Sequence, residues 1–311
     1  MSKISIIVPC YNEEECIELY YNEMQKIVEQ LETEFEYIFV NDGSKDKTLS
    51  IMRSLAQKDP NVKYVSFSRN FGKEAAMYAG LKAATGDYVG LMDVDLQDPP
   101  HLLLEMYNGI VNEGYDCVAS RRTTRKGEPP IRSFFARRFY KLINKISDAN
   151  ITDGARDYRL MTRTMVDAIL SLDEKDRFSK GIFGWVGFNI KWLEYENVDR
   201  VAGTTKWSFK KLWKYAIGGI QDFSTAPLAI SKFMSIMTFL GFLGLIASIF
   251  ICEWTNTFYN FNVLFLSSML CLMTSIICAC LGVMSSYLRK IYKESKNRPV
   301  FIVGETNTIV K

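Results

Sequence analysis

The stretch Tyr88-Val89-Gly90-Leu91-Met92-Asp93-Val94-Asp95-Leu96-Gln97-Asp98-Pro99-Pro100 decides the fold of this chain. A short apolar run, the pattern of a buried strand, ends here and acidic residues follow at once. In open α/β sheets, ligands bind at the carboxyl ends of the strands. Asp93 and Asp95 repel each other unless a cation lies between them, and their hard oxygen atoms favour magnesium or manganese, which usually carry phosphates. A solvated turn is the alternative, and it accounts for Asp98-Pro99-Pro100 but not for Asp93 and Asp95.

Short apolar runs alternate with amphipathic segments on both sides of this stretch. The runs expected as strands are residues 4–8, 37–40, 62–67, 88–92 and 115–119, and the segments expected as helices are residues 14–31, 46–57, 73–84 and 102–112. This alternation predicts an α/β domain with a mostly parallel sheet that is covered on both faces. Neither G-x-G-x-x-G nor a P-loop follows the first run, which disfavours dinucleotide binding and an ATP cradle.

Composition excludes several classes of protein. At 311 residues the chain has room for one or two domains, and its net charge of +3 is unremarkable. The seven cysteines include no C-x-x-C pair, which indicates a reducing compartment rather than a disulfide framework. His101 is the single histidine and lies at an expected helix start, so hydrolases that need a catalytic histidine are disfavoured.

Two long uncharged stretches, residues 233–252 and 261–288, each suffice to cross a bilayer, which takes about 20 apolar residues. A pair of buried core helices is the alternative. The linker between the stretches is short, so they predict a hairpin. By the positive-inside rule the basic residues on both flanks are cytoplasmic, namely Lys210, Lys211, Lys214, Lys232, Arg289, Lys290, Lys293, Lys296 and Arg298. The expected location is therefore the plasma membrane, multi-pass, with the large α/β domain in the cytoplasm.

Two basic amphipathic segments precede the hairpin. Residues 131–146 place apolar side chains at helical spacing among arginines and lysines, and residues 207–220 combine aromatic residues with lysines. Such segments lie on anionic membrane surfaces. Ordinary packing of one helix face onto the domain is the alternative for each, and the adjacent hairpin favours the membrane. No nucleic-acid partner is expected, because the apolar face is continuous.

Several motifs occur in a fixed order along the chain. Four lie after successive expected strands: Val8-Pro9-Cys10-Tyr11-Asn12-Glu13, Asn41-Asp42-Gly43-Ser44, Ser68-Arg69-Asn70-Phe71-Gly72-Lys73-Glu74 and the run from Asp93 to Pro100. Later ones are Asp157-Tyr158-Arg159-Leu160-Met161, Lys180-Gly181-Ile182-Phe183-Gly184-Trp185-Val186-Gly187-Phe188, Arg200-Val201-Ala202-Gly203-Thr204-Thr205-Lys206 and Arg298-Pro299-Val300-Phe301-Ile302-Val303. With these motifs the chain resembles the inverting GT-A glycosyltransferases of the large family that contains chitin and cellulose synthases. More closely, it resembles the polyprenyl-phosphate glycosyltransferases, which include dolichol-phosphate mannose synthase and bactoprenol glucosyltransferases.

The resemblance covers nearly the whole chain and implies four parts. These are a Rossmann-like, cytoplasmic GT-A domain over residues 1–205, a juxtamembrane amphipathic region over 206–230, two transmembrane helices over 231–289 and a cytoplasmic tail over 290–311. A homo-oligomer such as a tetramer is left open.

The resemblance also assigns the donor side of a site. Pro9, Tyr11 and Glu13 would cradle the nucleoside of a nucleotide sugar, and Asp42 would accept a hydrogen bond from its base. An Asx turn is the alternative for Asp42. Arg69 and Lys73 would face phosphate, with a surface ion pair as the alternative for Lys73. Asp93, Asp95 and Gln97 would hold Mg²⁺ or Mn²⁺, which neutralises the leaving nucleoside diphosphate.

The acceptor side would carry a phosphate of a polyprenyl lipid. Asp157 and Asp95 are the catalytic candidates, and the resemblance implies that Asp157 is the candidate base. A phosphate acceptor with a second pKa of about 6 is already ionised at neutral pH, so Asp157 would instead orient the acceptor or bind the metal. The expected grip on the acceptor phosphate comes from Arg121, Arg132, Arg138 and Lys206. Attraction to anionic lipid is the alternative for this basic segment.

The expected function is the transfer of a hexose, with inversion, from a nucleotide sugar to undecaprenyl phosphate or another polyprenyl phosphate, for glycosylation of the cell envelope. UDP-glucose and UDP-N-acetylglucosamine are the favoured donors. The alternatives are a processive polysaccharide synthase, although its Q-x-x-R-W motif is absent, and an inactive membrane-surface scaffold. The chain departs from the family pattern at Arg156, where many relatives have glycine, and at Thr204-Thr205.

Overall fold

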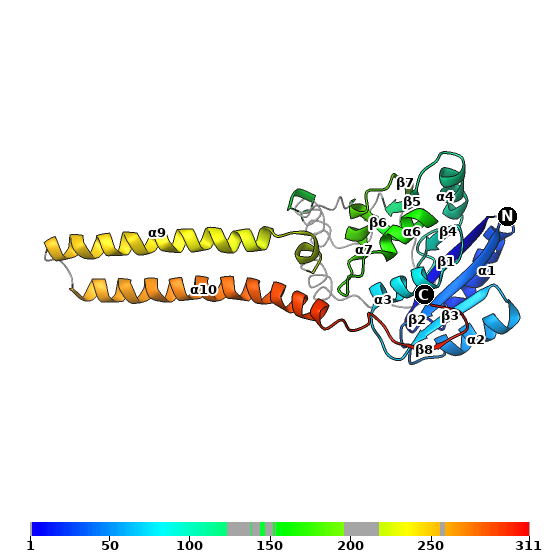
Figure 1. Cartoon of the computed structure of the whole chain (residues 1–311), viewed down its shortest axis with the longest axis horizontal. Helices are drawn as coiled ribbons and strands as arrows, with labels where there is room; N and C mark the ends of the chain where they lie inside the picture. Colours follow the sequence, from blue (N-terminus) through cyan, green and yellow to red (C-terminus); the bar gives the residue numbers. More distant parts are fainter. Residues whose placement is uncertain are drawn as a thin grey trace. The chain divides into compact units, whose positions relative to one another are not determined.

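The computed structural model describes residues 2–122, 138, 144–146, 152, 154–195, 218–255 and 259–310. The chain forms two compact units, Met1–Gly219 with Arg298–Lys311 and Ile220–Asn297. The first unit is an α/β domain and the second consists of long helices (Figure 1).

A single mixed sheet organises the first unit. Its strands within the described residues are β1 (Lys3–Cys10), β2 (Glu34–Asn41), β3 (Val62–Phe67), β4 (Tyr88–Leu91), β5 (Cys117–Arg122), β6 (Ala155–Thr162), β7 (Ile190–Tyr195) and β8 (Val303–Thr306), in the order β7-β5-β6-β4-β1-β2-β3-β8. The neighbouring strands β4, β1, β2 and β3 are parallel to one another, and β7 is parallel to β5. The antiparallel strands are β6, between β4 and β5, and β8, beside β3. The expected α/β, mostly parallel architecture is confirmed.

Helices cover both faces of this sheet. They are α1 (Ile17–Val28), α2 (Thr48–Lys58), α3 (Lys73–Ala83), α4 (Leu102–Val111), α6 (Arg163–Leu170) and α7 (Ser179–Trp185). Alternation along β1 shows the two faces: Ile6 and Val8 join a core with residues of α1 and α4, whereas Ile7 meets α3. At Gly80 of α3 an added Cβ would lie 2.1 Å from Ile7 Cγ2, so only glycine permits this close packing.

The carboxyl-terminal segment returns to the sheet of the first unit. Strand β8 pairs with β3, and Phe301 stacks on Phe67 with ring centroids 5.0 Å apart. Glu305 on β8 pairs with Arg53 of α2 and accepts a hydrogen bond from Tyr64 at 2.7 Å. The tail therefore closes one edge of the sheet.

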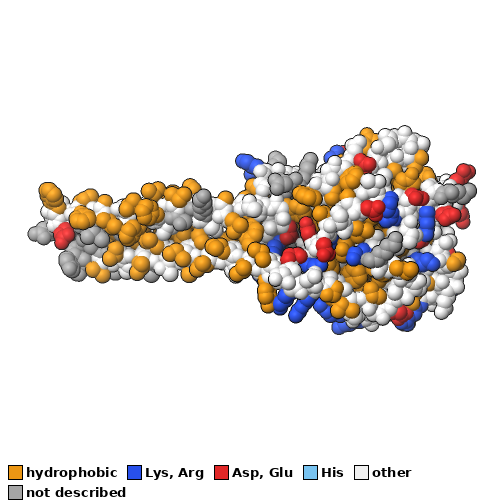
Figure 2. Space-filling view, in the orientation of Figure 1, with side chains coloured by type: hydrophobic (Ala, Val, Ile, Leu, Met, Phe, Trp, Pro, Cys, Tyr) orange, Lys and Arg blue, Asp and Glu red, His pale blue; other side chains and the backbone are white. Residues whose placement is uncertain are grey.

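The second unit contains two long helices, α9 (Ala226–Thr255) and α10 (Tyr259–Ser295), which pack side by side. Their exposed surface is largely hydrophobic (Figure 2). Within the described residues, Phe265–Ser295 is long and apolar enough to cross a membrane, judged by length and composition. Tyr287 of α10 donates to the Ser224 carbonyl at 2.7 Å, and Lys290 of α10 pairs with Asp222. Polar contacts therefore join α10 to the segment just before α9.

Candidate active site

One lysine joins two aspartates at the carboxyl end of β4. Lys73 Nζ lies 2.7 Å from Asp93 Oδ1 and 2.9 Å from Asp93 Oδ2, and it donates to Asp157 Oδ2 at 2.5 Å. Three residues from distant motifs thus meet in one ion-pair cluster. The sequence predicted each residue for the site but not their contact.

The sheet register explains why Asp93 and Asp157 meet. Strand β6 runs antiparallel to β4, with Tyr88 opposite Thr162 and Leu91 opposite Arg159. Continuing this register by two residues beyond the end of β4 places Asp93 opposite Asp157. Because β6 is inserted between β4 and β5, its first residues lie beside the acidic turn.

Positive charge surrounds Asp157. Burial by itself would raise the pKa of this carboxyl, but the charges of Lys73, Lys180 and Arg156 hold it well below its usual range. Burial would likewise lower the pKa of the Lys73 ammonium, whereas Asp157 and Asp93 raise it above its usual value. Both side chains are therefore charged at neutral pH.

The backbone at Asp157 is clamped by cationic side chains. Lys180 of α7 donates to the carbonyl of Ala155 at 3.0 Å. Arg159, whose side chain is fully buried under the ring of Phe183, donates to the carbonyls of Arg156 and Asp157 at 2.9 and 3.2 Å. These bonds hold the start of β6 and hence the position of the Asp157 carboxylate.

A second network fixes the turn after β4, and the sequence analysis missed it. Asp98 is completely buried, accepts a hydrogen bond from Tyr195 of β7 and pairs with Arg156 Nε at 3.1 Å. Arg156 also lies 3.9 Å from Asp93, and Arg122 donates to the Gln97 side chain at 3.3 Å. Asp98 is thus more than a turn residue. The sequence held one indication of this network, the arginine at position 156 where many relatives have glycine, because a charged residue next to Asp157 needs a partner.

Asp95 lies in the same turn and is 5% exposed. Its Oδ1 accepts the backbone N–H of Gln97 at 3.2 Å. Burial raises the pKa of the Cys16 thiol to about 11, and the charges of Glu13 and Asp95 add to this effect. The loop after β1 and the acidic turn thus both contribute negative charge that acts on Cys16.

The loops after β1 and β2 are joined by hydrogen bonds. Asn12 N donates to Ser44 Oγ at 2.9 Å, and Glu13 N donates to Thr48 Oγ1 at 2.9 Å. Pro9 lies near the end of β1, Tyr11 and Glu13 follow the strand, and all three are half-buried. The structure thus places these nucleoside candidates at the edge that carries Asp93, and their contacts with a nucleoside stay predictions.

Asp42 holds the loop that leads into α3. Its carboxylate accepts backbone N–H groups from Phe71 at 2.6 Å and Gly72 at 3.0 Å, and the Asn70 side chain at 2.8 Å. The side-chain-to-backbone bond within this motif is made by Asn41, which accepts from Ser44 N at 3.0 Å. Asp42 therefore has a structural role of its own, and its predicted contact with a base stays untested.

Two further residues shape the same loop. Gly43 has a φ of +66°, and an added Cβ would lie 2.4 Å from the carbonyl carbon of Arg69, so no other residue fits. Arg69 is exposed and stacks over the Phe71 ring at 4.0 Å. Its guanidinium remains accessible to a phosphate.

The acceptor candidates are described only in part. Arg121 pairs with Glu194 of β7, and strand alternation turns the neighbouring Arg122 towards the acidic turn instead. Arg138 is exposed. Arg132 and Lys206 lie outside the described residues.

Asp93, Asp95 and Gln97 carry the oxygen donors that a hard divalent cation takes. Asp93 and Asp157 already share one cation, the Lys73 ammonium, and Asp95 lies two residues further along the same turn. With the side chains in this arrangement, the described part of the chain contains no group of three His, Cys, Asp or Glu residues placed to hold a metal. Asp93, Asp95 and Gln97 thus stay predicted ligands, and Lys73 fills the cation position between the carboxylates.

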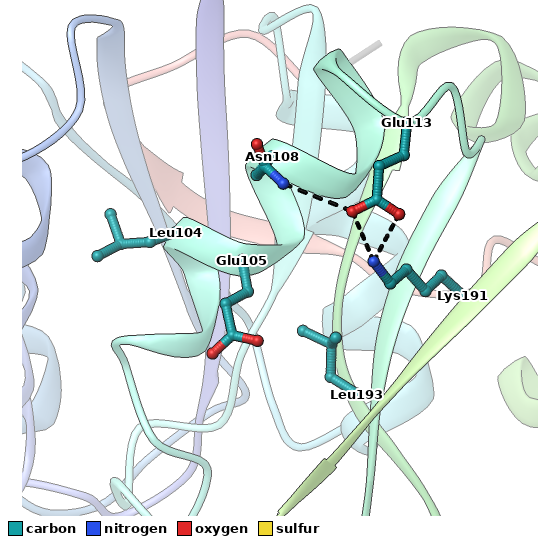
Figure 3. A pocket seen from close by; sticks show the side chains of 6 residues that line it. All are labelled: Leu104, Glu105, Asn108, Glu113, Lys191 and Leu193. Atoms are coloured by element: carbon teal, nitrogen blue, oxygen red, sulfur yellow. Dashed lines mark hydrogen bonds and ion pairs between the residues drawn. The ribbon is translucent and has the colours of Figure 1, made fainter.

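A shallow pocket lies elsewhere on the first unit (Figure 3). It is lined by side chains of α4 and β7 and by the ion pair between Glu113 and Lys191, whose closest atoms are 2.6 Å apart. None of the predicted site residues lines it. We therefore locate the candidate site at the carboxylate cluster and not at this pocket.

Comparison with known proteins shows the family of the chain. The model of the family described as "Glycosyl transferase family 2" matches residues 5–170. The chain belongs to glycosyl transferase family 2. It is 40% identical over 304 residues to the protein CsbB from Bacillus subtilis (strain 168), covering 98% of this chain and 92% of that protein. It is also 40% identical over 314 residues to the bactoprenol glucosyl transferase of Shigella phage SfV, covering 97% and 98%.

Among solved structures, mannosyl-3-phosphoglycerate synthase from Rubrobacter xylanophilus is similar, with a TM-score of 0.49, 16% identity and coverage of 71% of this chain and 72% of that one. The family resemblance inferred from the motifs is confirmed, and the protein is a glycosyltransferase. Its donor, acceptor and metal are matters of proposal.

Proposed function

We propose that this glycosyltransferase moves a hexose from a nucleotide sugar to undecaprenyl phosphate or another polyprenyl phosphate, with inversion at the anomeric carbon. The observation that carries the proposal is near full-length similarity, at 39% to 40% identity, to relatives named bactoprenol glucosyl transferase. UDP-glucose is the first candidate donor because these relatives are named as glucosyl transferases. UDP-N-acetylglucosamine is the second.

The charges of the cluster support the transfer of a sugar between two phosphates. The donor diphosphate and the acceptor phosphate are both anions, so their approach needs fixed cations. Lys73, Arg156 and Lys180 gather around Asp157 and act on it through their charge. Arg156 and Lys73 also flank Asp93. The site therefore places positive charge beside both Asp93 and Asp157.

Asp93, Asp95 and Gln97 would hold a divalent metal at this turn. Such a metal, when bound, neutralises the charge of a leaving nucleoside diphosphate. The turn itself is kept in place by Asp98, whose carboxylate is shared by Arg156 and Tyr195. These contacts hold the backbone of the turn that carries the predicted metal ligands, before any substrate binds.

Asp157 would orient groups in the site. A phosphate acceptor has a second pKa of about 6 and carries its negative charge at neutral pH, so it needs no base. The clamp on residues 155–157 holds the backbone that carries the Asp157 carboxylate. Positioning of this kind accelerates a reaction by holding the reacting atoms in line.

The second unit would hold the enzyme at the membrane that contains the lipid acceptor. The helix Phe265–Ser295 meets the length and composition needed for a membrane span, and α9 packs beside α10. We infer that both helices cross the plasma membrane as a hairpin, with the α/β unit in the cytoplasm. The lipid-linked sugar would then serve glycosylation of the cell envelope.

The transfer is tested with membranes that contain the full chain. They are incubated with radiolabelled UDP-glucose or UDP-N-acetylglucosamine, undecaprenyl phosphate and Mn²⁺, and label is followed into the organic phase. Membranes with Asp95→Asn at equal protein level are the matched control and should give almost no lipid label. Absence of lipid label with both donors, or label that enters a polymer instead, would refute the proposal. NMR of the product decides inversion.

A further inference from the structure

Lys73 lies between Asp93, a predicted metal ligand, and Asp157. Its ammonium contacts oxygen atoms of both carboxylates within 2.9 Å. These contacts join the first residue of α3 to the turn after β4 and to the start of β6. A positive side chain thus performs, within the protein, the charge neutralisation expected of a bound cation.

The position of Lys73 at the start of its helix does not by itself favour a positively charged side chain. It is the first residue of α3, and Gly72 precedes it with a φ of +102°. The positive end of the helix dipole disfavours a lysine at this position. The favourable energy must therefore come from Asp93 and Asp157 across the site.

While Lys73 remains in place, its ammonium neutralises part of the negative charge of Asp93 and Asp157. A divalent cation that approaches these two carboxylates meets repulsion from the ammonium. Once the ammonium leaves, the same carboxylates attract the cation strongly.

The side chain of Lys73 is able to leave although its backbone is held. The three preceding residues are bonded to the Asp42 carboxylate, which fixes the start of α3. The side chain itself is 31% exposed, and its partners Asp93 and Asp157 are 22% and 18% exposed. A lysine has a flexible four-carbon stem, so its ammonium reaches a new partner without movement of the helix.

Resting on the proposed function, we propose that Lys73 is a built-in counter-ion that competes with the divalent metal and exchanges Asp93 and Asp157 for the diphosphate of the donor. The metal and the nucleotide then bind together, because the arriving phosphates supply the new partner of the ammonium. In this exchange the divalent metal replaces the ammonium at the carboxylates, and the ammonium neutralises part of the phosphate charge that arrives with the metal. No covalent bond changes.

The first test measures Mn²⁺ binding to the full-length protein in detergent without nucleotide. Free Mn²⁺ is followed by electron paramagnetic resonance, which does not depend on turnover. Lys73→Met should bind Mn²⁺ about tenfold or more tightly than the wild type, because a competing charge is removed. Lys73→Arg keeps the charge and should stay near the wild type. If Lys73→Met does not fold, Lys73→Gln takes its place.

Lys180→Met is the matched control for charge in general. It also removes one positive charge near Asp157, but the Lys180 ammonium bonds to the carbonyl of Ala155. Its effect on Mn²⁺ affinity should be smaller than that of Lys73→Met. Equal effects of the two variants would overturn direct competition. So would unchanged or weaker Mn²⁺ binding by Lys73→Met, or no Mn²⁺ binding by either wild type or variant.

The second test measures UDP binding by calorimetry at saturating Mn²⁺. Lys73→Met should bind UDP about tenfold or more weakly, although it binds Mn²⁺ alone more tightly. This opposite pair of changes separates an exchange of partners from loss of structure, which would weaken both. A gain or no change in UDP affinity would overturn the exchange. If the wild type binds no UDP, the proposed donor is wrong, and the Mn²⁺ titration still decides the role of Lys73.

Discussion

Replacing Asp98 with asparagine should destabilise the α/β unit and the turn that carries the predicted metal ligands. Asp98 is completely buried and forms an ion pair with Arg156 and a hydrogen bond with Tyr195. The Arg156 side chain is only 24% exposed, so Asp98→Asn leaves a largely buried guanidinium without its main partner. Such a loss costs about 3–5 kcal/mol. Asp93, at 3.9 Å, retains part of the attraction, so we expect the low end, about 3 kcal/mol.

The assay is the apparent melting temperature of the full chain in detergent, followed by tryptophan fluorescence. For a unit of this size, 1 kcal/mol corresponds to about 2–4 °C, so Asp98→Asn should lower the melting temperature by about 6–12 °C. Tyr195→Phe removes only one hydrogen bond to the same carboxylate and is the matched control. It should cost about 1 kcal/mol, or about 2–4 °C.

A double-mutant cycle separates the ion pair from general damage. Arg156→Gln removes the guanidinium that Asp98→Asn leaves without its main partner. The double variant should therefore lose about 2 kcal/mol less stability than the two single losses added together. Strictly additive effects, or an Asp98→Asn loss no larger than that of Tyr195→Phe, would refute the reasoning.

Three further predictions follow from the structure. Asp157→Asn should lower turnover by a factor that stays constant above the second pKa of the acceptor phosphate, about 6, because the acceptor is then fully charged; a gap that closes steadily as pH rises towards about 9 would show that Asp157 is a base. Glu36 is buried and accepts hydrogen bonds from Lys3 at 2.7 Å and Ser5 at 2.5 Å. Burial by itself would raise the pKa of Glu36, but the bonds from Lys3, Ser5 and Thr85 lower it, so its stabilisation is present above the unfolded pKa of about 4.3 and is lost as pH falls below it. Glu36→Gln should therefore cost about 1–3 kcal/mol at neutral pH, and its melting temperature should approach that of the wild type in acid; a difference independent of pH would contradict this. In a background without reactive cysteines, Trp254→Cys should be labelled on intact cells by an impermeant thiol reagent and Ile309→Cys should not; the reverse pattern would overturn the hairpin topology.

Local patterns determined the framework of the α/β unit. Alternation of apolar runs and amphipathic segments predicted the first five strands and the first four helices, because side-chain periodicity reports directly which face of an element is buried. The observed bounds differ by a few residues: the helix expected over residues 14–31 is α1 (Ile17–Val28), and the strand expected over 115–119 is β5 (Cys117–Arg122). The carboxylates after residue 92 predicted the candidate site for a different reason, since the carboxyl ends of parallel strands share the edge of a sheet at which ligands bind.

Pairings between distant segments were decided by the tertiary structure alone. The antiparallel insertion of β6 between β4 and β5 brings Asp157 to Asp93, and no local pattern encodes which strands become neighbours. For the same reason the sequence showed charged residues at Lys73, Asp98 and Arg156 but not their partners. The return of β8 to the edge beside β3 is also non-local. Periodicity is a property of consecutive residues, whereas strand order and ion pairing depend on how the whole chain packs, and the contacts of the candidate site belong to the second kind.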